Sequence, residues 1–263
     1  MIAEDAELLA GLVSVAVVIV AWPSWYGDVV RVNRLTAPRS YRLLLGLTPI
    51  ACLLFLFLCL ERWAAKAVRE SNLYLLIYAV IGAAVLGAAA QLFFVLGISA
   101  RDDVLEKRNG ASLIAVVGAL LGATLCIAGG NIGEGPGVQV VAISSGTALC
   151  AWFVLWYVAD VLSGRVISER ITVERDAGSG IRLAGLLVAN GVILGAAAAG
   201  DWIPGRFLHA FAESAWPALA FSVAAVVVER TWKLPSSVGR SVLIASGYLL
   251  IAVAWAIHRG FGP

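Results

Sequence analysis

The chain has 263 residues, of which 61% are hydrophobic and only 14% are charged, and its net charge at pH 7 is +2. A soluble globular domain carries about 25% charged residues, so this composition excludes an ordinary water-soluble protein and requires lipid as the main solvent. The small net charge and the lack of a dense basic tract argue against nucleic acid as a partner.

Hydrophobic segments long enough to cross a bilayer recur along the whole sequence. A membrane helix needs roughly 20 mostly apolar residues, and this requirement predicts an all-α integral membrane protein with about eight transmembrane helices. The predicted spans are 8–22, 43–61, 73–98, 111–133, 139–162, 181–203, 207–228 and 239–257. The first is the shortest, because Pro23 is expected to end it, and the sequence leaves open whether it spans fully.

The basic residues are distributed unevenly between the two sides of this predicted bundle. Fourteen of the 19 Lys and Arg residues fall in alternate loops, at 23–42, 99–110, 163–182 and 229–240. The positive-inside rule therefore places these loops in the cytoplasm and both termini outside it. The acidic first residues lack the positive n-region of a secretory signal, so the first span is expected to be retained.

One basic loop lies on the opposite side. Arg62, Lys66 and Arg69 would be external, and they alternate at helical spacing with Glu61 and Glu70. We expect this segment to form a short interfacial helix whose charges make ion pairs.

Two polar helix starts are related by a shift of 67 residues. Arg108-Asn109 leads into the fourth span and Arg175-Asp176 leads into the sixth. At this position the side chains of Asn109 and Asp176 would act as N-caps, accepting hydrogen bonds from free backbone N–H groups. A further hypothesis is that the two caps meet near the cytoplasmic face and form a polar cluster.

The related starts predict a chain built from repeated hairpins. We expect a single polytopic domain over 1–263, a bundle of parallel two-helix hairpin repeats. The approximate hairpin units are 8–61, 73–133, 139–203 and 207–257. Repeats that run in the same direction differ from the inverted repeats of many transporters, which disfavours an alternating-access transporter.

The residues at these helix starts resemble a known family. The stretches at 103–111 and 174–185, with the continuation at 189–195 and 199–202, look like the two repeats of YjfL-type bacterial inner-membrane proteins. The shared pattern is an acidic loop followed by Asn or Asp and small residues entering a Gly-rich helix. The resemblance covers about residues 73–255. It implies a bacterial inner-membrane location and repeated two-helix units, but no reaction, because the family has no established activity.

Small residues at four-residue spacing occur in two of the spans. Gly118 is followed by Gly122, and Gly191 by Gly195. Such spacing lets helix backbones approach closely in lipid, so packing is the expected role, with a hinge or a close approach to a ligand as the alternative.

Polar side chains within the spans are candidates for function, because ionisable groups are costly there. Glu213 lies in the seventh span with His209 four residues before it, on the same helix face. The pair could be a proton-linked carboxylate and its partner, or an acid in the interfacial zone bonded to a neighbouring helix. Gln91 and Asn190 are expected to make interhelical hydrogen bonds, with pore lining as the alternative.

Two acids lie where a span meets a basic loop. Asp160 closes the fifth span and Glu229 closes the seventh, both on the predicted cytoplasmic side. We expect them to pair with bases of those loops rather than to bind ions.

No motif for catalysis, a cofactor or a metal is visible. The sequence has no HExxH, no phosphate-binding glycine loop with Lys-Ser/Thr, and no Ser/His/Asp combination. The four cysteines lie in apolar runs without paired spacing and are expected to pack as small apolar residues. An enzyme is therefore not expected.

Two functions remain open from the sequence. The first is a non-enzymatic membrane scaffold or stress-associated module, with anionic lipid at its cytoplasmic face and protein partners or further copies of the chain as possible ligands. The second is a channel or small-solute transporter that uses Glu213, Gln91 and Asn190. These hypotheses differ in whether the three side chains converge on one water-accessible cavity.

Overall fold

The protein is an all-α, multi-pass membrane protein. A computed structural model describes residues 2–31, 37–231 and 237–260, and over these ranges it contains helices and no strand. The long helices are α1 (Ile2–Arg31), α2 (Arg39–Trp63), α4 (Asn72–Leu92), α5 (Gly110–Gly129), α6 (Val138–Leu162), α8 (Ala177–Ala198), α9 (Phe207–Thr231) and α10 (Val238–Arg259). Each is long and apolar enough to cross a membrane, α4 together with the 3₁₀ helix η1 (Phe93–Leu96). The short elements are α3 (Lys66–Arg69), α7 (Val166–Thr172) and a π-helix, η2 (Ala100–Glu106).

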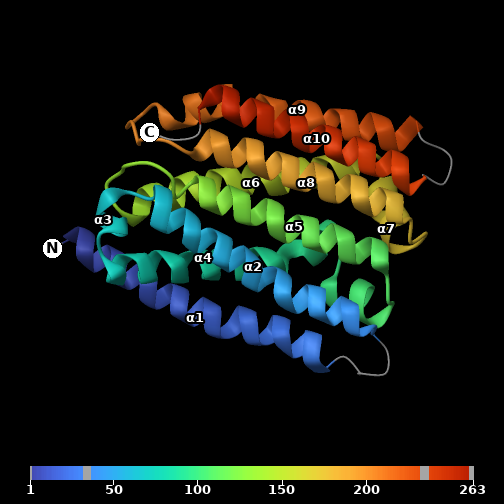
Figure 1. Cartoon of the computed structure of the whole chain (residues 1–263), viewed down its shortest axis with the longest axis horizontal. Helices are drawn as coiled ribbons and strands as arrows, with labels where there is room; N and C mark the ends of the chain where they lie inside the picture. The colour runs from blue at the N-terminus through green and yellow to red at the C-terminus, as the bar shows by residue number, and fades with distance from the viewer. Residues whose placement is uncertain (1, 32–36, 232–236, 261–263) are drawn as a thin grey trace.

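The long helices are arranged around a row in which α2, α5, α8 and α10 pack side by side (Figure 1). Helices α4 and α6 pack against α5, α6 and α9 pack against α8, and α1 packs against α4. The four helices of the row all begin at the same end of the bundle. The central pair, α5 and α8, is covered most completely by protein.

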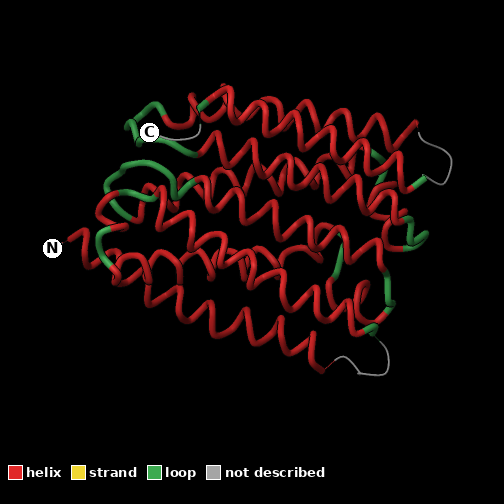
Figure 2. The backbone as a smooth tube through the Cα atoms, viewed as in Figure 1, coloured by secondary structure: helices red, strands yellow, loops and turns green. Residues whose placement is uncertain are grey.

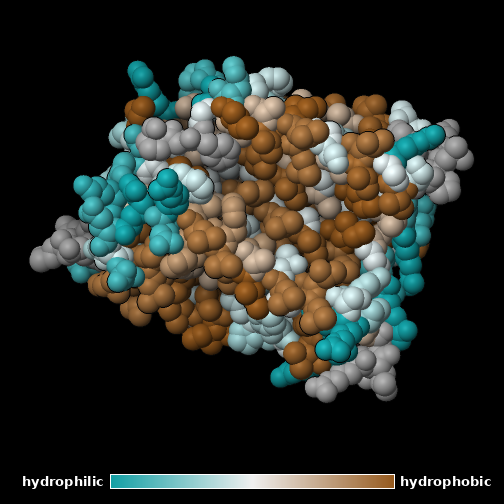
Figure 3. All heavy atoms as spheres, in the orientation of Figure 1, coloured by the Kyte–Doolittle hydropathy of each residue, from teal (hydrophilic) through white to brown (hydrophobic). Residues whose placement is uncertain are grey.

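The connections lie at the two ends of the bundle (Figure 2). We call the end with residues 97–109 and 163–176 the basic end. The end with residues 64–71, 130–137 and 199–206 is the terminal end, because α1 begins there and α10 ends there. Hydrophilic residues gather at these ends, and an apolar surface separates them (Figure 3). That distribution matches a bundle whose middle is solvated by hydrocarbon.

Helix α1 continues through Pro23 to Arg31, so the prediction that Pro23 ends the first span is wrong. A proline in a membrane helix is tolerated where neighbouring groups stabilise the interrupted backbone. Here two indoles on either side of Pro23 anchor the helix. Trp22 Nε1 donates to the carbonyl of Ala83 at 3.1 Å, and Trp25 Nε1 donates to that of Leu45 at 3.0 Å.

The bounds of several other helices also differ from the predicted spans, and two of the differences have a clear local cause. The segment predicted at 73–98 is α4 followed by η1, and it ends at Gly97, whose φ of 85° only glycine adopts readily. Helix α8 begins at Ala177 rather than 181, because the Asp176 cap starts the helix before the apolar run does. It ends at Ala198, where Ala199 becomes extended.

The short interfacial helix expected around Lys66 is present as α3. Lys66 Nζ lies 3.7 Å from Glu70 Oε1, with both side chains exposed. The backbone N–H of Lys66 donates to Glu134 Oε1 at 2.9 Å, which joins α3 to the loop after α5.

The α5–α8 interface brings two backbones into direct contact, as the glycine spacing predicts. A Cβ added at Gly118 would lie 2.5 Å from the Cα of Ala184, and one added at Gly191 would lie 2.5 Å from the carbonyl oxygen of Gly122. A Cβ at Gly122 would in turn overlap the carbonyl of Leu187. The two helices run in the same direction, since contacts advance together along both chains.

We predict that Gly122→Ala destabilises the bundle by about 1–3 kcal/mol, because the new methyl group overlaps the backbone carbonyl of Leu187 and the indole nitrogen of Trp152. Unfolding in a detergent micelle titrated with SDS measures the change. Gly146→Ala in α6 is the matched control, because a Cβ there meets nothing within 4 Å. Equal stability of the two variants would contradict the close contact.

Candidate functional site

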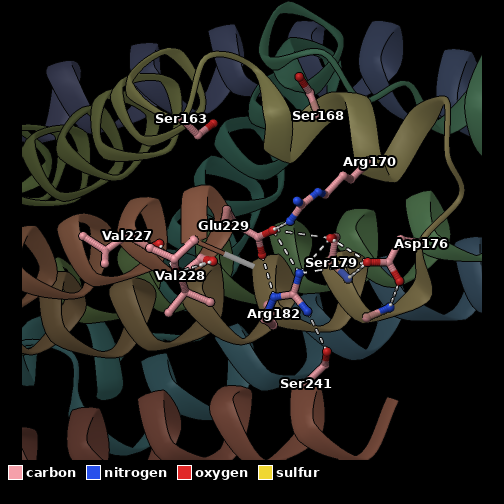
Figure 4. A network of polar contacts seen from close by, with 12 residues as sticks. Ser163, Ser168, Arg170, Asp176, Ser179, Arg182, Val227, Val228, Glu229 and Ser241 are labelled. Atoms are coloured by element: carbon pink, nitrogen blue, oxygen red, sulfur yellow. Dashed lines mark hydrogen bonds and ion pairs between the residues drawn. The ribbon is translucent and has the colours of Figure 1, made fainter. Parts of the chain in front are cut away.

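A cluster of buried charged side chains lies at the basic end, where α7, α8, α9 and α10 meet (Figure 4). At its centre Arg182 of α8 and Glu229 of α9 form a two-point ion pair. Arg182 Nε donates to Glu229 Oε1 at 2.5 Å, and Nη2 donates to Oε2 at 2.9 Å. The two side chains are 4% and 5% exposed. Bidentate pairs of this kind are strong and fix the relative orientation of both groups.

Arg182 makes two further hydrogen bonds, both to serine hydroxyls. Nη1 donates to Ser241 Oγ of α10 at 2.7 Å, and Nη2 donates to Ser179 Oγ at 2.9 Å. Ser179 Oγ donates in turn to Asp176 Oδ2 at 2.9 Å. Arg182 thus joins α8 to α9 through Glu229 and to α10 through Ser241, in both cases by hydrogen bonds.

A second arginine reaches the same carboxylate from α7. Arg170 Nη1 donates to Glu229 Oε2 at 2.8 Å, and its side chain is 17% exposed. Asp176 Oδ2 lies 4.0 Å from Arg182 Nη2 and supplies a second negative charge. Two arginines and two carboxylates therefore lie within one network, which holds α7, α8 and α9 together.

The two predicted N-caps are confirmed. Asn109 Oδ1 accepts from the N–H groups of Ala111 at 2.9 Å and Ser112 at 3.3 Å. Asp176 accepts from Gly178 at 2.9 Å and Ser179 at 3.2 Å. These bonds satisfy donors that the first turn of a helix otherwise leaves free.

The residues before the caps share an unusual backbone conformation. Arg108 has a φ of 54° and Arg175 a φ of 58°, in the left-handed region that non-glycine residues adopt rarely. The backbone N–H of Asn109 donates to the backbone carbonyl oxygen of Asp103 at 3.1 Å. The backbone N–H of Asp176 donates to the backbone carbonyl oxygen of Arg170 at 2.9 Å. The two helix starts therefore have the same local structure.

Both caps also bond to the last turn of α7. Asn109 Nδ2 donates to the carbonyl oxygen of Ile171 at 2.6 Å, while the backbone N–H of Asp176 bonds to Arg170. Helix α7 therefore connects the start of α5 to the start of α8. Of the two caps, Asp176 takes part in the Arg182 network.

The other predicted polar residues lie at separate places. Gln91 Nε2 donates to the carbonyl of Ala21 at 3.2 Å, between α4 and α1. Asn190 Nδ2 donates to Ser222 Oγ at 3.1 Å, between α8 and α9, and its Oδ1 has no hydrogen-bond partner among the described residues. Both amides make the expected interhelical bonds.

Glu213 and His209 pair on the surface of α9. Glu213 Oε1 lies 3.2 Å from His209 Nε2, and the two side chains are 62% and 83% exposed. They share one helix face, as their spacing predicts, and they point away from the bundle core.

The predicted pairing of Asp160 and Glu229 with bases of the basic loops is confirmed. Asp160 Oδ2 lies 3.9 Å from Arg165 Nη1, and its Oδ1 accepts from the N–H of Ser168 at 2.9 Å. In the loop before α5, Lys107 Nζ donates to Asp103 Oδ1 at 2.8 Å. That carboxylate raises the pKa of Lys107 by hydrogen bonding and by its charge.

Sequence reasoning missed the central role of Arg182. It counted Arg182 with the loop at 163–182, whereas the side chain is buried in α8. The Asp176 cap was the available signal. A helix that begins at the cap places Arg182 more than one turn inside, where an ionisable group requires a partner.

We predict that Glu229→Ala destabilises the protein by about 3–5 kcal/mol, because it leaves Arg182 buried without its counter-charge. The double variant Arg182→Met with Glu229→Leu should recover much of this loss, since it removes the buried Arg182 cation together with its counter-charge. SDS titration of the micellar protein measures both. Glu213→Ala, which breaks an exposed pair on the same helix, should leave stability unchanged. A similar loss from Glu213→Ala would refute the assignment.

Comparison of the chain with protein-family models, curated proteins and solved structures found no match.

Proposed function

We propose that this membrane protein is a non-enzymatic scaffold of the bacterial inner membrane. The observation that carries the proposal is the dispersal of its polar side chains within the bundle. Gln91 bonds to α1, Asn190 bonds to α9, and Glu213 faces outward. A channel or transporter that uses these three residues needs them along one path through the bundle. Instead, the three residues lie in three separate places, on α4, α8 and α9.

The packing of the bundle supports the same proposal. The backbones of α5 and α8 touch at the centre, and the Arg182 network ties four helices together at the basic end. Alternating access requires packed elements to separate. A scaffold instead benefits from rigid helices that present constant surfaces to lipid, to protein partners or to further copies of the chain.

We infer that the basic end faces the cytoplasm. Fourteen of the 19 basic residues fall in the sequence segments 23–42, 99–110, 163–182 and 229–240, which connect helices at this end, and basic segments of this kind stay on the cytoplasmic side. Exposed bases there, such as Arg165, can attract the anionic lipid of that leaflet. The proposal leaves both termini outside the cytoplasm.

We also propose that the hairpins ending in α5 and α8 are internal repeats. Their support is the shared backbone conformation of Arg108 and Arg175 and the shared capping by Asn109 and Asp176. The proposed kinship with YjfL-type proteins rests on these same residues.

We predict that liposomes containing the purified protein show no flux of protons, potassium or common metabolites above empty liposomes. Glu213→Ala and Asn190→Leu should leave this result unchanged. Flux that is present in the wild type and lost in either variant would instead favour the transporter.

The orientation is tested by labelling intact cells with a membrane-impermeant maleimide. In a chain carrying Cys150→Ala, which removes the exposed cysteine, we expect Arg206→Cys to be labelled and Arg165→Cys to be labelled only after lysis. The opposite pattern would reverse the proposed orientation.

A further inference from the structure

An apolar groove lies between α2, α5 and α8, toward the terminal end. Its volume is about 270 Å³. Helix α2 contributes Phe55, Cys59 and Trp63 to one wall, and α8 contributes Val192 and Ala196 to the other. Helix α5 forms the floor between them.

The groove exists because its floor is made of small residues. Gly129 of α5 and Gly195 of α8 are so close that a Cβ on either would overlap the backbone of the other helix. No side chain from these positions can fill the space above them. Phe55 and Trp63, 43% and 48% exposed, border this recess on the side of α2.

The surroundings of the groove determine what can fill it. Apart from Ile132 in the turn after α5, its lining residues belong to segments long and apolar enough to span a membrane. An apolar cavity of about 150 Å³ stays free of water and takes up a hydrocarbon ligand. A larger groove bordered by lipid therefore suits a hydrocarbon chain better than water.

A cation lies on the same helix stripe as the groove wall. Phe55, Cys59 and Arg62 follow one another at spacings of four and three residues, which places them on one face of α2. Arg62 is exposed and makes no ion pair with any described residue. Glu134, a nearby acid at this end, is already bonded to the backbone of Lys66. Arg62 is thus available to an anion at the terminal end of the groove.

We propose that the groove binds one acyl chain of an anionic phospholipid from the adjoining leaflet, with the lipid phosphate against Arg62. The apolar recess selects the chain. The guanidinium bonds to the phosphate oxygens and favours an anionic headgroup, because the phosphate charge of such a lipid is not offset by a cation like choline. This site lies at the opposite end from the Arg182 network and does not depend on the scaffold function.

The proposal is tested by native mass spectrometry of the full chain in mild detergent, with phosphatidylglycerol or phosphatidylcholine added. The wild type should retain one phosphatidylglycerol in preference to phosphatidylcholine. Ala196→Phe places a ring in the groove and should remove most of the retained lipid. Ala254→Phe, at an exposed position near the same end of α10, is the matched control and should retain it.

The headgroup contact is tested separately. Arg62→Gln should lower the preference for phosphatidylglycerol about fivefold, the effect of one basic residue near an anionic surface. Arg206→Gln, an exposed base at the same end outside the groove, should leave that preference unchanged. Equal preference in the wild type and Arg62→Gln would overturn the phosphate contact.

Two results would overturn the assignment of the groove as a lipid-binding site. One is equal lipid retention by the wild type and by two variants that fill the groove, Ala196→Phe and Val192→Phe. The second variant keeps the test valid if Ala196→Phe fails to fold. The other is a wild-type dimer that retains no lipid and that Ala196→Phe dissociates, since the groove would then be occupied by a second copy of the chain.

Discussion

The backbones of α5 and α8 are in direct contact, and the other helices are arranged around this contact. Lipid offers little hydrophobic drive for two helices to associate, so close packing and polar bonds must hold them. Gly118, Gly122 and Gly191 allow that packing because no side chain separates the two backbones. The flanking helices then pack around this central pair, and α2 and α10 occupy its two sides.

The close contact between α5 and α8 also determines where the polar side chains gather. Since α5 and α8 run in the same direction, their capped starts lie at one end, and α7 bonds to both. Arg182 follows the second cap into the bundle, where α9 and α10 surround it. At the other end, the glycines that close the interface leave a recess in the surface. One packing solution therefore produces a rigid ionic end and an apolar groove.

Much of the fold could be predicted because its signals are local. The caps at Asn109 and Asp176 and the glycine pairs depend on residue type and spacing, and the structure confirms each. Pro23 misled the prediction because a proline interrupts a helix in isolation, whereas a helix packed in a membrane bundle tolerates it. Trp22 and Trp25, on either side of Pro23, bond to the carbonyls of Ala83 and Leu45 in other helices. These hydrogen-bond partners are distant in the sequence, so local sequence patterns could not predict them.

Residue types and their order were enough to predict about eight membrane-spanning helices, because hydropathy adds up residue by residue within each segment. The described residues contain eight helices long and apolar enough to cross a membrane. The excess of basic charge in alternate loops is likewise a property of the sequence. Which polar groups meet depends instead on how the helices pack. Arg182 and Glu229 lie 47 residues apart in the chain, and their pairing depends on α8 and α9 being neighbours. The cost of burying a charge explains why Arg182 and Glu229 each need a partner. The packing of the helices determines which partner each of them has.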